Sequence, residues 1–143
     1  MSQQRICISD AEMAEMLRCS GVLTLRRAAE RVSSWPRRGR QPTPWALLKP
    51  GQLLWVGENY TVTAFGQGTY KADGQPWSFT GNAFGAPAAV TAPGERYPKR
   101  RQSFAMPKEI SRFTLKVVSC EVQGSDVLLK VEVHRCNWSE FNG

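Results

Sequence analysis

Residues 53–60 read Leu53-Leu54-Trp55-Val56-Gly57-Glu58-Asn59-Tyr60, an apolar run that ends in a carboxylate, an amide and a phenol. An uninterrupted apolar run of this length is typical of a strand that is buried on both faces. The preceding residues, Lys49-Pro50-Gly51-Gln52, have the composition of a turn. We therefore expect a core strand that carries the polar side chains of residues 58–60 to a functional site.

The composition of the chain indicates how many domains it can form and what kind of molecule it can bind. With 143 residues, of which 41% are hydrophobic, the chain can form one domain with one ordinary core. It carries 19 lysines and arginines against 12 acidic residues, a net charge of +7. Such a protein attracts polyanions over a long range, and counterion release adds to the binding free energy. Composition alone does not separate nucleic acid from an anionic membrane surface.

Most of the basic residues lie in two segments, 26–49 and 95–116, each of which contains seven lysines or arginines. The parts of these regions that are rich in proline or glycine, about 33–45 and 81–101, are expected to be basic loops. Trp35 and Trp45 bracket the arginines of the first loop, as in proteins that stack unpaired bases on aromatic rings. Alternatively, the two indoles pin the loop to the core, and the charged runs are only solvated loops.

The cysteines and the N-terminus bear on metal binding and on location. Cys7, Cys19, Cys120 and Cys136 form no Cys-x-x-Cys pair, so we expect free thiols, no metal site and no cofactor. Residues 1–8 lack the apolar core of a signal peptide, and no apolar run reaches membrane-spanning length. We therefore expect a cytoplasmic protein without a membrane contact. The sequence makes no prediction of the oligomeric state.

The first half of the chain predicts one helix and several strands. Ser9-Asp10-Ala11-Glu12 has the spacing of a capping box and predicts a helix over residues 10–19. Alternating apolar residues predict a strand over 22–26, and residues 27–32 have the composition of a further helical turn. A meander is expected over residues 61–79, with a turn at Asp73-Gly74.

A hairpin is predicted at the C-terminal end, where residues 113–122 and 127–136 flank Gln123-Gly124-Ser125-Asp126. With Gly124-Ser125 as the two-residue loop, Cys120 pairs with Leu129. This register places one alternating set on the core face: Val118, Cys120, Val122, Val127, Leu129, Val131 and Val133. Together the elements predict an α+β protein that is mostly β, and closure into a small barrel would remove its exposed strand edges.

Three segments resemble blocks of the ASCH family of phage and prophage proteins, which belongs to the PUA-like superfamily. They are residues 54–60, residues 70–74 and Met106-Pro107-Lys108-Glu109-Ile110-Ser111-Arg112-Phe113-Thr114-Leu115, in the order found in the family. The resemblance implies a single ASCH-like domain over residues 1–143, with a small PUA-like β-barrel and short flanking helices. It also implies a cleft that receives RNA or a modified nucleobase.

The chain departs from the family at the end of the first helix. ASCH domains commonly carry a Gly-x-Lys-x-x-x-x-Arg signature, and the corresponding positions here are Cys19, Gly21 and Arg26. In the family's amidohydrolases, which deacetylate acetylated cytidine, the lysine helps to activate a threonine that corresponds to Thr24. A hydroxyl without a neighbouring base is a poor nucleophile. Because Gly21 replaces the lysine, we do not expect this amidohydrolase activity.

Three functions follow from these observations. The first is the binding of RNA or single-stranded nucleic acid in a basic cleft, where arginines contact phosphate and Glu58 or Asn59 reads a base edge. The predicted binding residues are Arg26, Arg27, Arg31, Trp55, Glu58, Asn59, Tyr60, Arg100, Arg101 and Arg112. The second is a ribonuclease, or a hydrolase of a modified nucleoside, with Thr24, Glu58 and Lys71 as catalytic candidates. The third is a phage protein that binds an acidic host protein.

Glu58 has two alternative roles in these hypotheses. As a general acid or base, it would need a raised pKa to act near neutral pH. As a buried structural carboxylate, it would pair with Arg26 or Arg112. The sequence leaves both roles open.

Overall fold

The structure, a computed structural model, describes residues 4–33, 39–79, 88–91 and 97–141. Within these ranges the chain is mostly β, with one helix longer than four residues, α1 (Asp10–Arg18). The strands are β1 (Gln4–Cys7), β2 (Val22–Ala28), β3 (Glu30–Ser33), β4 (Gly39–Pro42), β5 (Leu53–Gly57), β6 (Tyr60–Ala64), β7 (Gln67–Tyr70), β8 (Pro76–Ser78), β9 (Lys99–Arg101), β10 (Thr114–Gln123) and β11 (Asp126–His134). Short helical segments are η1 (Pro44–Leu47), α2 (Ala88–Thr91), η3 (Ser103–Ala105), η4 (Lys108–Ile110) and η5 (Trp138–Glu140).

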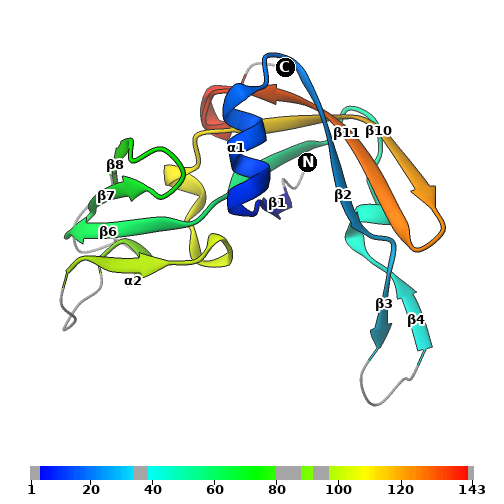
Figure 1. The fold of residues 1–143 in the computed structure, drawn as a ribbon, viewed down its shortest axis with the longest axis horizontal. Coiled ribbons are helices and arrows are strands. Elements are labelled where there is room, and N and C mark those ends of the chain that lie inside the picture. Colours follow the sequence, from blue (N-terminus) through cyan, green and yellow to red (C-terminus); the bar gives the residue numbers. More distant parts are fainter. Residues whose placement is uncertain (1–3, 34–38, 80–87, 92–96, 142–143) are drawn as a thin grey trace.

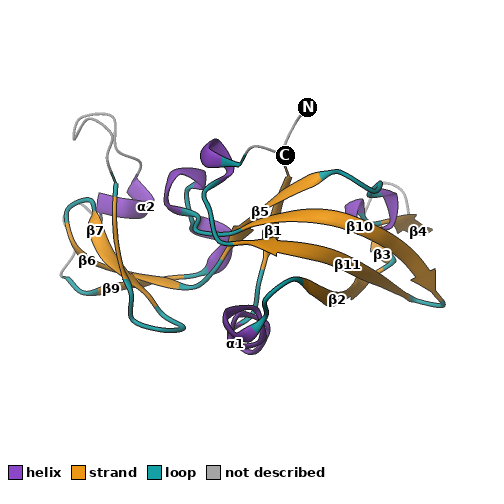
Figure 2. Ribbon diagram, turned by 90° about the horizontal axis from the view of Figure 1, so that it is seen from above, coloured by secondary structure: helices purple, strands orange, loops and turns teal. Residues whose placement is uncertain are grey.

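A five-stranded sheet in the order β1-β5-β10-β11-β2 forms the larger half of the molecule (Figure 1). Strand β5 pairs in parallel with β1 and antiparallel with β10, and its central residues Leu54 and Val56 are fully buried. Helix α1 lies against one face of this sheet and buries Met13 and Met16 (Figure 2). The predicted helix and the predicted core strand are therefore confirmed. Both follow from local signals, because the helix starts at the Ser9–Glu12 capping box.

A four-stranded sheet in the order β8-β7-β6-β9 forms the smaller half. It has a separate core on one face, which contains Tyr60, Val62, Tyr70, Trp77 and Val90. The meander β6-β7-β8 was predicted and is confirmed. Only Glu58 and Asn59 separate β5 from β6, so residues 53–64 run from one sheet directly into the other.

The strands β3 and β4 pair as a hairpin that extends away from the five-stranded sheet (Figure 1). Two expectations for this region are wrong. Residues 27–32 form the end of β2 and the start of β3 rather than a helical turn, and part of the expected loop 33–45 is β4 and η1. Trp45 is half-buried and packs against the larger core, whereas Trp35 lies outside the described residues. In the expected loop 81–101, Lys99–Arg101 form β9, and residues 81–87 and 92–96 are outside the described ranges.

The C-terminal hairpin has the predicted turn but not the predicted register along its whole length. Gly124 has a φ of +62°, and the expected pair Cys120–Leu129 is present. A bulge between Val117 and Ser119 then shifts the pairing by one residue. Val127, Leu129 and Val131 are buried as predicted. Val118 and Val122 are instead 37% and 55% exposed, because the bulge and the protruding hairpin tip remove them from the core.

The described strands form three open sheets, and no sheet closes on itself within this part of the chain. The α+β, mostly β class is thus confirmed, whereas the expected closure into a barrel is not observed. Strand β5 ends at Gly57, and the chain continues into a second sheet with its own core instead of completing the first.

Candidate functional site

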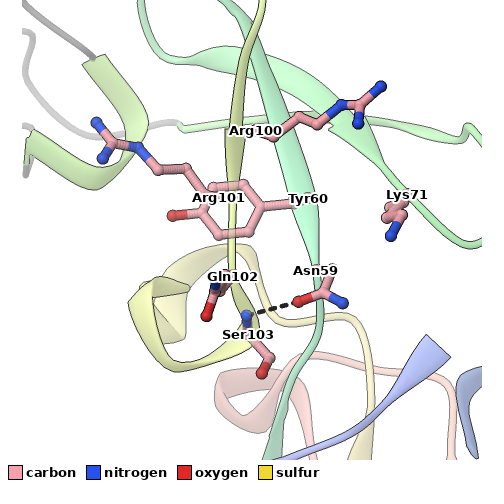
Figure 3. Close-up of a pocket in the computed structure, with 7 residues that line it drawn as sticks. All are labelled: Asn59, Tyr60, Lys71, Arg100, Arg101, Gln102 and Ser103. Carbon is pink, nitrogen blue, oxygen red and sulfur yellow. Dashed lines mark hydrogen bonds between the residues drawn. The ribbon is translucent and has the colours of Figure 1, made fainter.

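A pocket of about 400 Å³ lies where β6 starts and β9 ends. Figure 3 shows its lining, which contains three cations, two amides, a phenol and a hydroxyl: Asn59, Tyr60, Lys71, Arg100, Arg101, Gln102 and Ser103. None of these seven side chains is acidic. The volume is within the range of small-ligand sites in proteins.

Strand pairing brings these residues together from three parts of the chain. Tyr60 on β6 is the register partner of Arg101 on β9 and of Tyr70 on β7. The Lys71 amide then donates to the Asn59 carbonyl at 3.1 Å, which extends the β6–β7 pairing to the pocket. Because side chains alternate along a strand, Arg100 and Arg101 leave β9 on opposite sides, as Figure 3 shows.

Gly57 allows η3 to approach the end of β5 closely. A Cβ atom at this position would lie 2.6 Å from the Ser103 carbonyl oxygen, so any larger residue would push η3 away. From its position, η3 presents the Ser103 amide to the Asn59 side chain, whose Oδ1 accepts at 2.9 Å. The small residue in the Val56-Gly57-Glu58 segment therefore shapes one wall of the pocket.

Asp10, the first residue of α1, contacts two of the residues that line the pocket. Its Oδ2 lies 2.7 Å from Lys71 Nζ, and its Oδ1 accepts from Asn59 Nδ2 at 2.9 Å. The hydrogen bond from Lys71 is the main cause of a pKa for Asp10 below its ordinary value, so this carboxylate is ionised at neutral pH. Both side chains of the ion pair are half exposed. Such a pair stabilises the fold by about 1 kcal/mol or less.

Tyr60 and Arg100 differ in how much of their hydrogen-bonding capacity is free. The Tyr60 hydroxyl lies 3.0 Å from each of two carbonyl oxygens, of Ala89 and Ala105, and burial raises its pKa to about 12. The Tyr60 hydroxyl is therefore a neutral donor with a structural role.

The Arg100 side chain is exposed, and within the described residues its guanidinium has no hydrogen-bond or ion-pair partner. Arg100 thus presents a full positive charge to any ligand of the pocket.

Glu58 lies next to this pocket in the chain but does not line it. It is 1% exposed, and its two oxygens accept from Arg112 Nε at 2.9 Å and Nη2 at 2.7 Å. Burial raises the pKa of Glu58, and the bidentate contact with Arg112 opposes that rise. Arg112 also donates to Asp73 at 2.6 Å and lies 4.1 Å above the Tyr70 ring. This arrangement corresponds to the structural alternative for Glu58, with Arg112 as the partner.

The remaining predicted residues lie on or near the five-stranded sheet. Thr24 and Arg26 are exposed on β2, where Arg26 pairs with Asp126 at 2.7 Å. Arg27 points to the other face and holds Glu12 through two hydrogen bonds, of 2.6 and 3.1 Å. Trp55 is 8% exposed under the Arg5 guanidinium, which is 5.6 Å from its ring centre. Arg31 is exposed on β3.

The structure therefore gathers five of the predicted residues into one pocket: Asn59, Tyr60, Lys71, Arg100 and Arg101. It separates the three catalytic candidates, because Thr24 is on an edge strand of the other sheet, Glu58 is buried and only Lys71 lines the pocket. Sequence reasoning missed Asp10, Gln102 and Ser103. The last two directly follow the basic run 99–101, which was the available signal.

Comparisons with family models, with curated proteins and with solved structures found no match for this chain. No helix in the described ranges is both long and apolar enough to cross a membrane. Among the same residues, no three His, Cys, Asp or Glu side chains are grouped so that they could hold a metal ion.

Proposed function

We propose that this protein is a binding module for RNA or single-stranded nucleic acid and that the pocket at Lys71 and Arg100 receives the phosphate backbone. The observation that carries the proposal is that Lys71 and Arg100 line one pocket on the same side of the sheet, where the one acidic neighbour is Asp10, paired with Lys71. Positive charge in a concave site attracts phosphate more strongly than the same charge spread over a flat surface. The net charge of +7 adds long-range attraction.

Each group in the pocket has a defined role in this proposal. The Arg100 guanidinium, which has no partner among the described residues, makes a forked contact with phosphate oxygens, and the Lys71 ammonium adds a point charge. Gln102 is exposed at the rim and supplies an amide that can both donate and accept. These contacts hold the backbone without reading the bases.

The resemblance of residues 54–60 and 106–115 to ASCH proteins supports the same ligand class. We accordingly propose an ASCH-like module that acts in the cytoplasm of a bacterial host cell. The proposal includes no catalytic step, because the carboxylate of Glu58 is already engaged by Arg112. It also requires no acidic protein partner.

The test is a titration of a fluorescently labelled single-stranded RNA, followed by anisotropy at several salt concentrations. With phosphate contacts from the two cations Arg100 and Lys71, the logarithm of the affinity should fall with a slope of about −1.4 against the logarithm of the salt concentration. Affinity should therefore drop about 7-fold between about 50 and about 200 mM salt. Single-stranded DNA and duplex RNA of the same length are titrated in parallel.

Matched variants locate the contacts. Arg100→Gln and Lys71→Gln should each weaken binding and make the slope shallower by about 0.7. Arg18→Gln on α1 and Lys130→Gln on β11 remove the same charge from exposed positions outside the pocket and should leave the slope unchanged. Undetectable binding at low salt, or equal losses in all four variants, would refute a phosphate site at this pocket.

A further inference from the structure

The pocket opens onto the exposed face of the four-stranded sheet, and this face has an unusual composition. One row of register partners crosses all four strands: Pro76 on β8, Thr69 on β7, Thr61 on β6 and Arg100 on β9. Register partners point to the same face of a sheet. The row therefore presents a ring, two hydroxyls and a guanidinium side by side.

A second row lies on the same face two residues further along each strand. It consists of Lys71, which follows β7, Asn59, which precedes β6, and Gln102, which follows β9. The hydrogen bond from the Lys71 amide to the Asn59 carbonyl confirms that these two are partners. These three residues also line the pocket, so the pocket and the sheet face form one continuous surface.

The opposite face of the sheet is fully used by packing. The residues that alternate along the strands with these two rows are all buried in the smaller core: Tyr60, Val62, Tyr70 and Trp77. The outer face is not a second core surface, since all its residues except Pro76 are polar and all are exposed or half-buried. We define the outer face by seven residues: Asn59, Thr61, Thr69, Lys71, Pro76, Arg100 and Gln102.

We infer that the outer face carries the sugar–phosphate backbone of a single strand that leaves the pocket, an inference that rests on the proposed function. The seven residues include two cations and no acid, and Asp10, which pairs with Lys71 at one edge, leaves Arg100 as the cation that a polyanion meets directly. Within the described residues, the hydroxyls of Thr61 and Thr69 have no hydrogen-bond partner and are available to phosphate oxygens or ribose hydroxyls.

The same face contains no aromatic side chain at any of its seven positions. Proteins that read or hold bases on a sheet stack them on aromatic rings. The Asn59 amide is already engaged by Asp10 and by the backbone amide of Ser103, so the groups left to a ligand are mainly hydroxyls and cations, which suit the sugar–phosphate backbone. The strand therefore lies with its backbone on the sheet and its bases toward solvent, and its affinity is independent of sequence.

The test uses Thr61→Val, Thr69→Val and the double variant, which remove the hydroxyls and keep a β-branched shape suited to strands. Each single variant should bind a homopolymeric RNA of uridine about two- to tenfold more weakly, with an unchanged salt slope because no charge is lost. The loss should be the same for homopolymers of adenosine and cytidine. Ser119→Ala, which removes an exposed hydroxyl from β10 of the other sheet, should have no effect.

The outcomes separate this inference from the proposed function. Unchanged affinity of the double variant, with binding still weakened by Arg100→Gln, would overturn the backbone track and leave the pocket standing. Losses that differ about tenfold among the homopolymers would overturn backbone-only recognition. If Arg100→Gln has no effect either, the proposed function itself fails. Circular dichroism and thermal unfolding establish that the variants are folded.

Discussion

Replacement of Arg112 by methionine tests the role assigned to the Glu58–Arg112 pair at the junction of the two sheets. The Glu58 side chain is 2% exposed and that of Arg112 is 17% exposed. Methionine keeps an unbranched chain of similar reach but removes both hydrogen bonds to Glu58, the contact with Asp73 and the guanidinium above Tyr70. A buried carboxylate is then left without a counter-charge.

The expected cost follows from this burial. Breaking a buried ion pair by removal of one partner destabilises a protein by about 3–5 kcal/mol, because desolvation of the remaining charge is no longer offset. Neutralising that charge as well should restore part of the stability. We therefore expect the double variant Arg112→Met/Glu58→Gln to be about 1–3 kcal/mol more stable than Arg112→Met.

The pH dependence of the variant has a defined sign. Burial raises the pKa of Glu58 above the ordinary value of 4.5, and without Arg112 nothing opposes that rise. Between the unfolded and the folded pKa, the folded state then binds more protons than the unfolded state. Its stability relative to the wild type must therefore fall as the pH rises from about 4.5 toward neutrality. The destabilisation should therefore be smaller at pH 5 than at pH 7.

The assay is urea unfolding, followed by tryptophan fluorescence, of the wild type, both single variants and the double variant at these two pH values. Comparison at equal pH cancels the titration of the carboxylates that do not contact Arg112; Asp73, whose pKa Arg112 helps to lower, is the exception. A loss of less than about 1 kcal/mol in Arg112→Met at pH 7 would contradict the reasoning. So would a double variant no more stable than Arg112→Met, because Glu58 would then not be an uncompensated charge.

Three further predictions separate structural from binding residues. Arg27→Gln should lower the free energy of unfolding by about 1–3 kcal/mol, because it removes two hydrogen bonds to Glu12. It should leave the salt slope of RNA binding unchanged, and a shallower slope would show that Arg27 contacts phosphate. Asp10→Asn should strengthen RNA binding about two- to fivefold, measured by anisotropy, since it frees Lys71 from an exposed ion pair; weaker binding would mean that Asp10 supports the site. Gly57→Ala should lower the melting temperature and weaken binding together, because its Cβ would lie 2.6 Å from the Ser103 carbonyl; wild-type behaviour in calorimetry would show that η3 can move freely.

Basic residues that look alike in the sequence have different roles in the fold. Arg26 and Arg27 are neighbours in one basic segment, but strand alternation sends Arg26 to an exposed position and Arg27 to Glu12 on α1. Arg100 and Arg112 belong to the second segment, where Arg100 is exposed without a partner among the described residues and Arg112 is held by Glu58 and Asp73. A charge count therefore overestimates the number of cations available to a ligand.

The sequence by itself determined the elements whose signals are local. The capping box placed the start of α1, the apolar run placed β5, and Gly124 placed the turn of the C-terminal hairpin. Each depends on side chains within a few residues of one another, so periodicity and turn chemistry were sufficient.

Only the tertiary structure decided what those elements do together. The bulge at Val118 changed which valines reach the core, and the close approach of η3 to Gly57 gave the pocket its wall. Asp10 meets Lys71 across 61 residues of sequence, and Glu58 meets Arg112 across 54. Local periodicity fixes the direction of a side chain relative to its own strand or helix. Its partner depends on how distant strands pair, which no local signal encodes.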